Sequence, residues 1–209
     1  PKINLNTIMQ FISRPSWCLN MMTAKKLNFG NIMGHVTNVT NLSSLASWTA
    51  DQFDPTLTWE DIAWIKDRWK GKLILKGIMD SEDAMLAVKA GADAIIISNH
   101  GGRQLDGAPS TISVLPEIVD AVNSKVEVHF DGGVRSGQDV LKALALGADC
   151  IHIGRPYVYG LGAKGQEGVE IAIEIIKKEL DLTMAMCGET NISNVGLHNL
   201  HHNPFKIIN

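Results

Sequence analysis

His100 and Arg103 are the residues of this sequence whose types and spacing best fit acid–base chemistry on an anionic molecule. They lie in the run Ser98-Asn99-His100-Gly101-Gly102-Arg103-Gln104-Leu105-Asp106, directly after the apolar residues 94–97. An imidazole can take a proton near neutral pH, and a guanidinium can bind a carboxylate through two parallel hydrogen bonds. The pair therefore predicts a base and a carboxylate-binding group in one loop. A histidine beside glycines is also common as a plain turn residue, so the pair alone does not distinguish a catalytic site from an ordinary turn.

Glycine and arginine recur together after two later apolar runs. The segment Asp131-Gly132-Gly133-Val134-Arg135 follows residues 126–130, and Gly154-Arg155 follows residues 150–153. Glycines let backbone N–H groups approach an anion closely, and two arginines would offset the charge of a phosphate. The pattern favours a phosphate site, although each segment alone fits a tight turn with a solvated arginine.

Lys76 ends another short apolar run, residues 73–75. An unpaired ammonium is costly in apolar surroundings. Lys76 either reaches solvent or pairs with Asp80, or it faces a cofactor that becomes anionic when reduced. If Lys76 faces such a cofactor and shares one site with His100 and Arg103, these residues predict oxidation of a hydroxy acid beside a phosphate-anchored, electron-accepting ring.

Alternating strands and helices, which the sequence predicts from Thr58 onward, must position these residues. Thr58 before Trp59-Glu60-Asp61 is an N-cap signal, and Gly91 and Gly147 are stop signals. The predicted helices are residues 58–69, 81–90, 112–122 (with Pro116 in its first turn), 137–146 and 168–180, and the predicted strands are 73–77, 94–98, 126–130 and 150–153. Such alternation indicates a parallel sheet covered by helices. In a (β/α)8 barrel, chemistry lies at the C-terminal ends of the strands.

Two further features concern the organisation of the chain. Ala90-Gly91-Ala92-Asp93 and Leu146-Gly147-Ala148-Asp149 are similar segments, each between a predicted helix and a predicted strand. Residues 1–57 contain a predicted helix at 5–12 but no strand pattern. Four strands cannot close a barrel and would leave two unpaired edges. We therefore expect an incomplete barrel, part of a longer chain, and the first residue, Pro1 rather than Met, agrees with this. The alternative is a half-barrel that pairs with a second polypeptide.

Composition sets broad limits on function. The 209 residues are 45% apolar, enough for a sizeable core, and the net charge of −3 disfavours nucleic-acid binding. The cysteines Cys18, Cys150 and Cys187 form no even-numbered framework, which favours reduced thiols in the cytoplasm. No run approaches the roughly 20 apolar residues that span a bilayer.

The strand-end motifs resemble those of a known family, the FMN-dependent L-2-hydroxy acid dehydrogenases and oxidases. The matching segments, in the family's order, are Leu75-Lys76-Gly77, residues 98–106, residues 131–135 and Gly154-Arg155-Pro156. The resemblance covers about residues 58–195, and Phe53-Asp54-Pro55 with Thr58-Trp59 is most similar to the bacterial respiratory L-lactate dehydrogenases. It implies that these strands are strands five to eight of a (β/α)8 TIM barrel.

The resemblance also implies FMN as cofactor and a role for each site residue. His100 would act as the base at C2 of the substrate, Arg103 would bind its carboxylate, and Lys76 would face the N1/O2 edge of the flavin. Whether His100 takes the C–H or the O–H proton stays open. The implied cofactor-binding residues are Lys76, Ser98 beside the flavin, Asp131 on the ribityl chain, and Gly132, Gly133, Arg135, Gly154 and Arg155 around the phosphate.

The expected reaction is oxidation of an L-2-hydroxy acid, L-lactate to pyruvate, with electrons passed to a respiratory quinone or cytochrome. One alternative is an oxidase that uses oxygen, similar to glycolate or lactate oxidase. Another is a non-catalytic half-barrel that binds flavin or phosphate. The family's substrate-contacting tyrosines and the aspartate paired with the catalytic histidine come from its first four strands. We therefore expect these 209 residues alone to be inactive, and the full-length protein to be a homo-oligomer.

The expected domain organisation has three parts. Residues 1–57 would hold a helix and the variable fourth βα loop, residues 58–190 the half-barrel, and residues 191–209 a disordered tail. Apolar residues at 17–48, beside Lys25 and Lys26, would suit a peripheral position on the inner membrane, and a mobile active-site loop is the alternative. No metal site is predicted, because His198, His201 and His202 lie in the tail, where nothing would hold their geometry.

Overall fold

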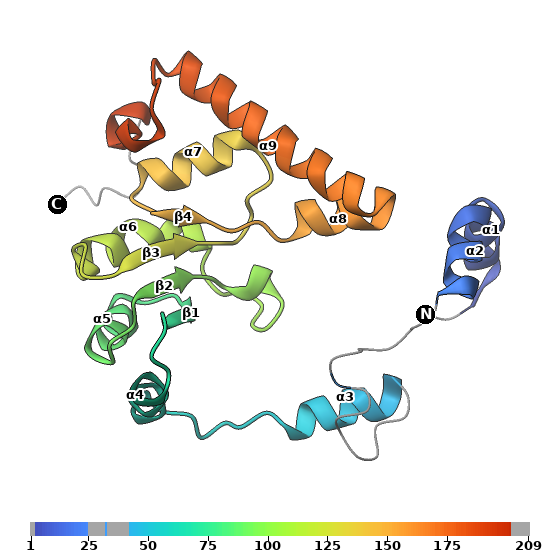
Figure 1. The fold of residues 1–209 in the computed structure, drawn as a ribbon, viewed down its shortest axis with the longest axis horizontal. Helices are drawn as coiled ribbons and strands as arrows, with labels where there is room; N and C mark the ends of the chain where they lie inside the picture. Colours follow the sequence, from blue (N-terminus) through green and yellow to red (C-terminus); the bar gives the residue numbers. More distant parts are fainter. Residues whose placement is uncertain (1–2, 25–31, 33–41, 202–209) are drawn as a thin grey trace. The chain divides into compact units, whose positions relative to one another are not determined.

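A four-stranded parallel sheet with the order β1-β2-β3-β4 organises residues 58–201 in the computed structural model (Figure 1). The strands are β1 (Ile74–Ile78), β2 (Ala94–Ile97), β3 (Glu127–Phe130) and β4 (Cys150–Ile151). The structure describes residues 3–24, 32 and 42–201. Spatial order follows chain order because each crossover helix returns the chain to the adjacent position. The predicted α/β fold with a parallel sheet is confirmed.

Six helices of the described chain accompany these strands: α4 (Trp59–Arg68), α5 (Ser81–Lys89), α6 (Thr111–Val122), α7 (Gly137–Ala145), α8 (Arg155–Lys164) and α9 (Gln166–Met186). Their starts follow local capping chemistry. Thr58 N–H donates to the Asp61 carboxylate at 2.7 Å, and Ser136 and Asp139 form a reciprocal capping box. The N-cap of α5 is Asp80, whose carboxylate accepts the Glu82 N–H at 2.8 Å.

The apolar core lies on one face of the sheet. Val128 and Phe130 of β3 belong to it together with Ile95 and Ile97 of β2, whereas His129 between them faces the other way. Helices α5, α6, α7 and α9 all add buried side chains to the same cluster. The strands are therefore apolar toward the helices and more polar on the opposite face.

The repeated Gly-Ala-Asp segments have one structural role. Asp93 and Asp149 each accept a backbone N–H through the side chain, from Leu73 and Val128 respectively, both at 2.8 Å. Each also donates its own N–H to the carbonyl of the same partner, at 2.8 Å. The two aspartates thus fasten the start of one strand to the strand before it. In Asp93, hydrogen bonds from Lys66, the Leu73 N–H and Lys72 hold the pKa well below its usual range.

Glycines allow close approach between helices at α9. A Cβ atom on Gly137, at the start of α7, would lie 1.9 Å from the Leu180 backbone nitrogen of α9. A Cβ atom on Gly160 of α8 would lie 2.2 Å from the carbonyl oxygen of Gly168. The positions of α7 and α8 against α9 therefore depend on residues without side chains.

Residues 1–57 form a separate compact unit with three described helices: α1 (Leu5–Ile12), α2 (Pro15–Thr23) and α3 (Leu42–Asp51). The predicted helix at 5–12 is confirmed, with Asn4 as its N-cap. Phe11 and Trp17 stack at a centroid distance of 5.8 Å, which joins α1 to α2. Helices α2 and α3 were not predicted. No helix in the described part of the chain is long and apolar enough to cross a membrane.

Several predicted boundaries are wrong. Pro116 lies inside α6 rather than in its first turn, β4 is shorter than predicted, α9 is longer, and α8 was not predicted. The tail expected to be disordered contains two 3-10 turns, Ile192–Asn194 and Leu197–Asn199. His198 Nε2 donates a hydrogen bond to the Glu189 carboxylate at 2.7 Å, which helps to hold this segment, and His202 lies outside the described residues.

Replacing Gly137 with alanine should destabilise the chain, because the new methyl group would force α7 away from the α9 backbone. We expect the free energy of unfolding to fall by about 1–3 kcal/mol, as in other overpacked sites. The matched control is Gly162→Ala in α8, where a Cβ atom meets nothing within 4 Å. Alanine should be neutral or slightly stabilising there. Equal unfolding curves for the two variants in urea would contradict this account of the α7–α9 contact.

Candidate functional site

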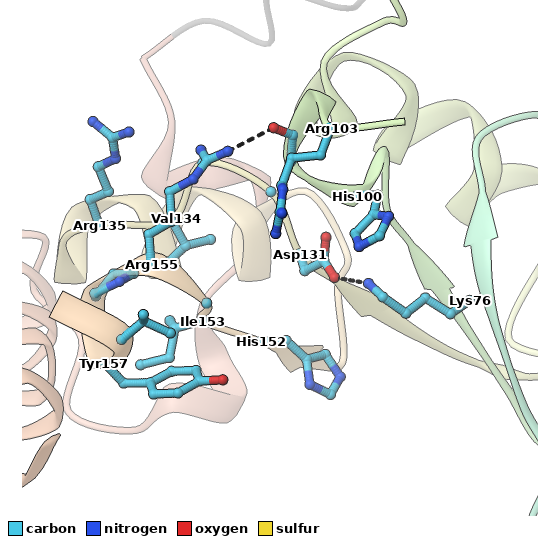
Figure 2. Close-up of a pocket in the computed structure, with 16 residues that line it drawn as sticks. Lys76, His100, Arg103, Asp131, Val134, Arg135, His152, Ile153, Arg155 and Tyr157 are labelled. Carbon is cyan, nitrogen blue, oxygen red and sulfur yellow. Dashed lines mark hydrogen bonds and ion pairs between the residues drawn. The ribbon is translucent and has the colours of Figure 1, made fainter. Parts of the chain in front are cut away.

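Lys76, Ser98 and Asp131 form one hydrogen-bonded group at the C-terminal edge of the sheet. Lys76 Nζ donates to Ser98 Oγ at 2.7 Å and forms an ion pair with Asp131 (Figure 2). Ser98 Oγ donates to Asp131 Oδ1 at 2.6 Å, and Ser98 is only 3% exposed. The three residues meet because β1, β2 and β3 are neighbouring parallel strands. The predicted alternative pairing of Lys76 with Asp80 is wrong, because Asp131 is the partner of Lys76 and Asp80 caps α5.

The loop after β2 presents His100 in an unusual backbone conformation. His100, Gly101 and Gly102 all have positive φ, at 55°, 66° and 70°. A left-handed residue other than glycine costs of order 1–3 kcal/mol and persists only where its surroundings hold it. The His100 N–H donates to Ser98 Oγ at 3.2 Å, and the Gly101 N–H donates to Asn99 Oδ1 at 3.0 Å. The turn that carries the exposed imidazole is therefore held by hydrogen bonds to Ser98 and Asn99.

The loops after β3 and β4 bring glycines and arginines to the same edge. Gly132 and Gly133 have φ of 108° and 82°, and Arg135 follows them. Gly154 is the N-cap residue of α8, which begins at Arg155 and has no side-chain cap. Arg155 Nη2 donates to the Gly101 carbonyl at 2.8 Å, which links α8 to the His100 loop (Figure 2).

A pocket of about 480 Å³ lies among these four loops. Its lining contains every predicted site residue except Ser98, namely Lys76, His100, Arg103, Asp131, Gly132, Gly133, Arg135, Gly154 and Arg155. Ser98 lies beneath it and hydrogen-bonds Lys76 and Asp131. The sequence prediction of one shared site is consistent with this arrangement.

The pocket also contains residues that sequence analysis did not select: Gly101, Val134, His152, Ile153, Pro156, Tyr157 and Val158. Tyr157 was missed because α8 was not predicted, although Pro156 directly after Gly154-Arg155 is a typical first-turn residue. His152 was missed because it lies just past β4 as the structure has it, in a segment predicted to be an apolar strand.

Cations dominate the charged groups of the pocket. Lys76, Arg103, Arg135 and Arg155 line it, against the single carboxylate of Asp131. Burial lowers the pKa of the His152 imidazole below its ordinary value of 6.5, and the neighbouring His129 adds to this shift. His152 is therefore neutral at pH 7. The net positive charge of the pocket suits an anionic ligand.

The arrangement separates two chemical tasks. Backbone N–H groups at glycine turns and at the start of an uncapped helix are suited to hold a phosphate, and Arg135 and Arg155 add positive charge there. His100 and Arg103, in the loop after β2, are suited to a base and a carboxylate clamp. The pocket would suit two molecules together, one that carries a phosphate and a separate small carboxylic acid.

Comparison with known proteins identifies the family of this chain. The sequence matches the FMN-dependent dehydrogenase family over residues 1–202. An L-lactate dehydrogenase of Vibrio cholerae serotype O1 (strain M66-2) is 41% identical over 201 residues, which make up 96% of this chain and 53% of that protein. An L-lactate dehydrogenase of Pseudomonas syringae pv. syringae (strain B728a) is 44% identical over 189 residues, or 90% of this chain and 50% of that protein. The chain thus spans about half the length of these curated relatives.

Solved structures give the same result. A monotopic membrane protein, (S)-mandelate dehydrogenase, superposes with a TM-score of 0.84 at 34% identity, covering 93% of this chain and 51% of that one. Mandelate oxidase superposes with a TM-score of 0.69 at 46% identity, covering 75% of this chain and 45% of that one. The resemblance inferred from the strand-end motifs is confirmed, FMN is the cofactor that these relatives use, and the chain belongs to the FMN-dependent dehydrogenase family.

Proposed function

We propose that the chain supplies the C-terminal half of an FMN-binding (β/α)8 barrel, with β1 to β4 as strands five to eight. Two observations support this proposal. The four strands follow one another in parallel order, and the chain spans about half of its relatives. A sheet of four strands also leaves β1 and β4 with free edges, which a further set of strands would pair. Catalysis would then need both halves, and the 209 residues alone would not turn over substrate.

The residues present fit FMN. Gly133, with its positive φ, and the start of α8 would turn backbone N–H groups toward the FMN phosphate, and Arg135 and Arg155 would neutralise its charge. Asp131 would accept hydrogen bonds from the ribityl hydroxyls, while Lys76, held by Ser98, would place a positive charge at the N1/O2 edge of the ring. Bound FMN would accept the two electrons removed from the substrate.

The function that this site supports best is oxidation of an L-2-hydroxy acid, L-lactate to pyruvate. The observation that carries it is the position of His100 and Arg103 on one turn at the pocket. Arg103 would bind the substrate carboxylate with two parallel hydrogen bonds and so orient C2. His100 would take a proton from C2 or from its hydroxyl group. The L-lactate dehydrogenases among the relatives favour lactate as the substrate.

A respiratory electron acceptor, a quinone or a cytochrome, fits the relatives named dehydrogenases. Oxygen is the second candidate, supported by the 46% identity to mandelate oxidase. The two differ in one measurable quantity, the rate of oxygen consumption by the FMN-loaded enzyme during oxidation of the hydroxy acid.

We also propose that residues 1–57 make peripheral contact with a membrane surface. Helices α1 and α2 expose large apolar side chains, among them Leu5, Ile12, Leu19 and Met22 at 80%, 68%, 62% and 84%. One structural relative is described as a monotopic membrane protein. Exposed apolar helices of this kind bind the boundary between lipid headgroups and acyl chains.

Loss of the arginines should weaken FMN binding through the phosphate alone. We expect Arg135→Ala and Arg155→Ala each to raise the Kd for FMN about 10- to 150-fold, because a hydrogen bond to a charged group contributes roughly 1.5–3 kcal/mol. Riboflavin, which lacks the phosphate, should bind wild type and variants alike in a flavin-fluorescence titration. The control is Lys142→Ala, an exposed cation of α7 outside the pocket. Equal losses for FMN and riboflavin would contradict the phosphate assignment.

The catalytic proposal is tested by joining these 209 residues to the remaining half of the Vibrio cholerae relative. The FMN-loaded chimaera should reduce an electron-accepting dye with L-lactate, and the 209-residue chain alone should not. His100→Gln should lower the rate about 100- to 10,000-fold, the usual contribution of a general base. The control, His198→Gln, lies outside the pocket. A chimaera that keeps its rate with His100→Gln, or that binds FMN without turnover, would exclude the assigned role.

Charge placed on α2 should abolish membrane contact. We expect the Leu19→Glu/Met22→Glu double variant to stay in the supernatant when sedimented with anionic phospholipid vesicles, while wild type sediments with them. The control is Ile175→Glu on α9, a side chain that is 51% exposed in the other unit. Wild-type protein that remains in the supernatant would rule the contact out.

A further inference from the structure

We propose that His129, Cys150 and His152 form a Zn²⁺ site on the sheet face opposite the apolar core. The proposal goes beyond the proposed function and does not depend on it. His129 Nδ1 and His152 Nε2 lie 3.1 Å apart. One ligand atom from each of His129, Cys150 and His152 lies within 4.8 Å of the other two.

Strand alternation brings the three side chains together. His129 on β3 pairs in register with Cys150 on β4. His152 lies two residues after Cys150, just past the end of β4. Side chains two residues apart along an extended chain share a face. The intervening Ile151 packs against the apolar core together with Ile153, so the Cys150 and His152 side chains lie on the face of His129.

The spacing of the two imidazole nitrogens matches what one tetrahedral ion requires. Zn–N bonds of about 2.0–2.1 Å at a tetrahedral angle place two nitrogens about 3.3 Å apart. The observed separation of His129 Nδ1 and His152 Nε2 is 3.1 Å. Cys150, which forms no disulfide, would supply a sulfur ligand at about 2.3 Å. Imidazole nitrogen and thiolate sulfur are both donors that Zn²⁺ binds, and three protein ligands leave the fourth position to water.

An outer carboxylate orients the first ligand. His129 Nε2 lies 3.3 Å from Glu127 Oε2, two residues earlier on β3. We assign the Nε2 proton to this contact, which leaves the Nδ1 lone pair directed at His152. A histidine that donates its other ring N–H to a carboxylate is the usual arrangement around bound zinc. The side chain of His129 is 11% exposed, so its ring is held by packing as well.

A hydrogen bond between the two imidazoles is the competing explanation. It would account for the 3.1 Å contact between His129 and His152. It gives no reason for the thiol of Cys150 on the same face. The strands of parallel sheets are usually rich in apolar, β-branched side chains on both faces. Three adjacent metal-binding residue types there favour an ion over a simple pair.

The test uses the reduced 209-residue chain without flavin, so that its result is separate from FMN binding and turnover. Titration with Zn²⁺ against a chromophoric chelator should give one equivalent bound. Titration with Co²⁺ should give intense visible bands of a tetrahedral ion and a near-ultraviolet band from thiolate-to-cobalt charge transfer. Absence of stoichiometric binding, or a Co²⁺ spectrum without the thiolate band, would overturn the proposal.

Variants locate the site. Cys150→Ser and His152→Gln should each raise the Kd for Zn²⁺ more than about 100-fold, whereas Glu127→Gln should raise it about 10-fold, as for loss of an outer partner. Cys187→Ser and His198→Gln remove an exposed thiol and an exposed imidazole outside the group and should change nothing. An unchanged Kd for Cys150→Ser, or loss of binding in a control, would refute the site. If a variant fails to fold, the thiolate band of the wild type still decides.

Discussion

The carboxylate of Asp131 is the group on which the strand-end site depends. It accepts from both Lys76 and Ser98, so it satisfies an ammonium that follows an apolar run and a hydroxyl that is almost fully buried. Removing one partner of such a group leaves the others unsatisfied, which costs more than the bond itself contributes. Ser98 in turn accepts the His100 N–H. The ends of β1, β2 and β3 are thereby joined by one continuous set of hydrogen bonds.

This group also determines which charges are available to a ligand. Asp131 is the carboxylate of the pocket lining and it is paired with Lys76. Arg103 and Arg135 form no ion pair within the described part of the chain, and Arg155 donates to a carbonyl rather than to an acid. The guanidinium groups therefore keep their full charge for anions, while the one ammonium is already partly neutralised. A site built in this way separates strong anion-binding groups from the fixed, partly neutralised charge of Lys76.

The strands and the Thr58 cap could be predicted because their signals are local. Apolar β-branched runs and a threonine before acidic residues need no knowledge of the rest of the chain. Helix α8 could not be predicted in this way, because Gly160 and Gly162 lower its intrinsic helix propensity. Its stability comes from the approach of Gly160 to Gly168, a tertiary contact. Inside α6, the fully buried Leu115 and Ile118 offset the cost of Pro116 in a similar way.

The site residues divide in the same way, into those that local sequence signals indicate and those that only tertiary contacts bring together. Strand-end residues could be grouped from sequence because parallel strands end at one edge, whatever their partners are. The pairing of Lys76 with Asp131 instead joins residues 55 positions apart, and that of His129 with His152 joins residues 23 apart. Neighbours in sequence drew attention to the histidines near the C-terminus, whereas strand register brings together the group with metal-ligand geometry. His152 belongs to that group and also lines the pocket, so the polar face of the sheet and the strand-end site share one side chain.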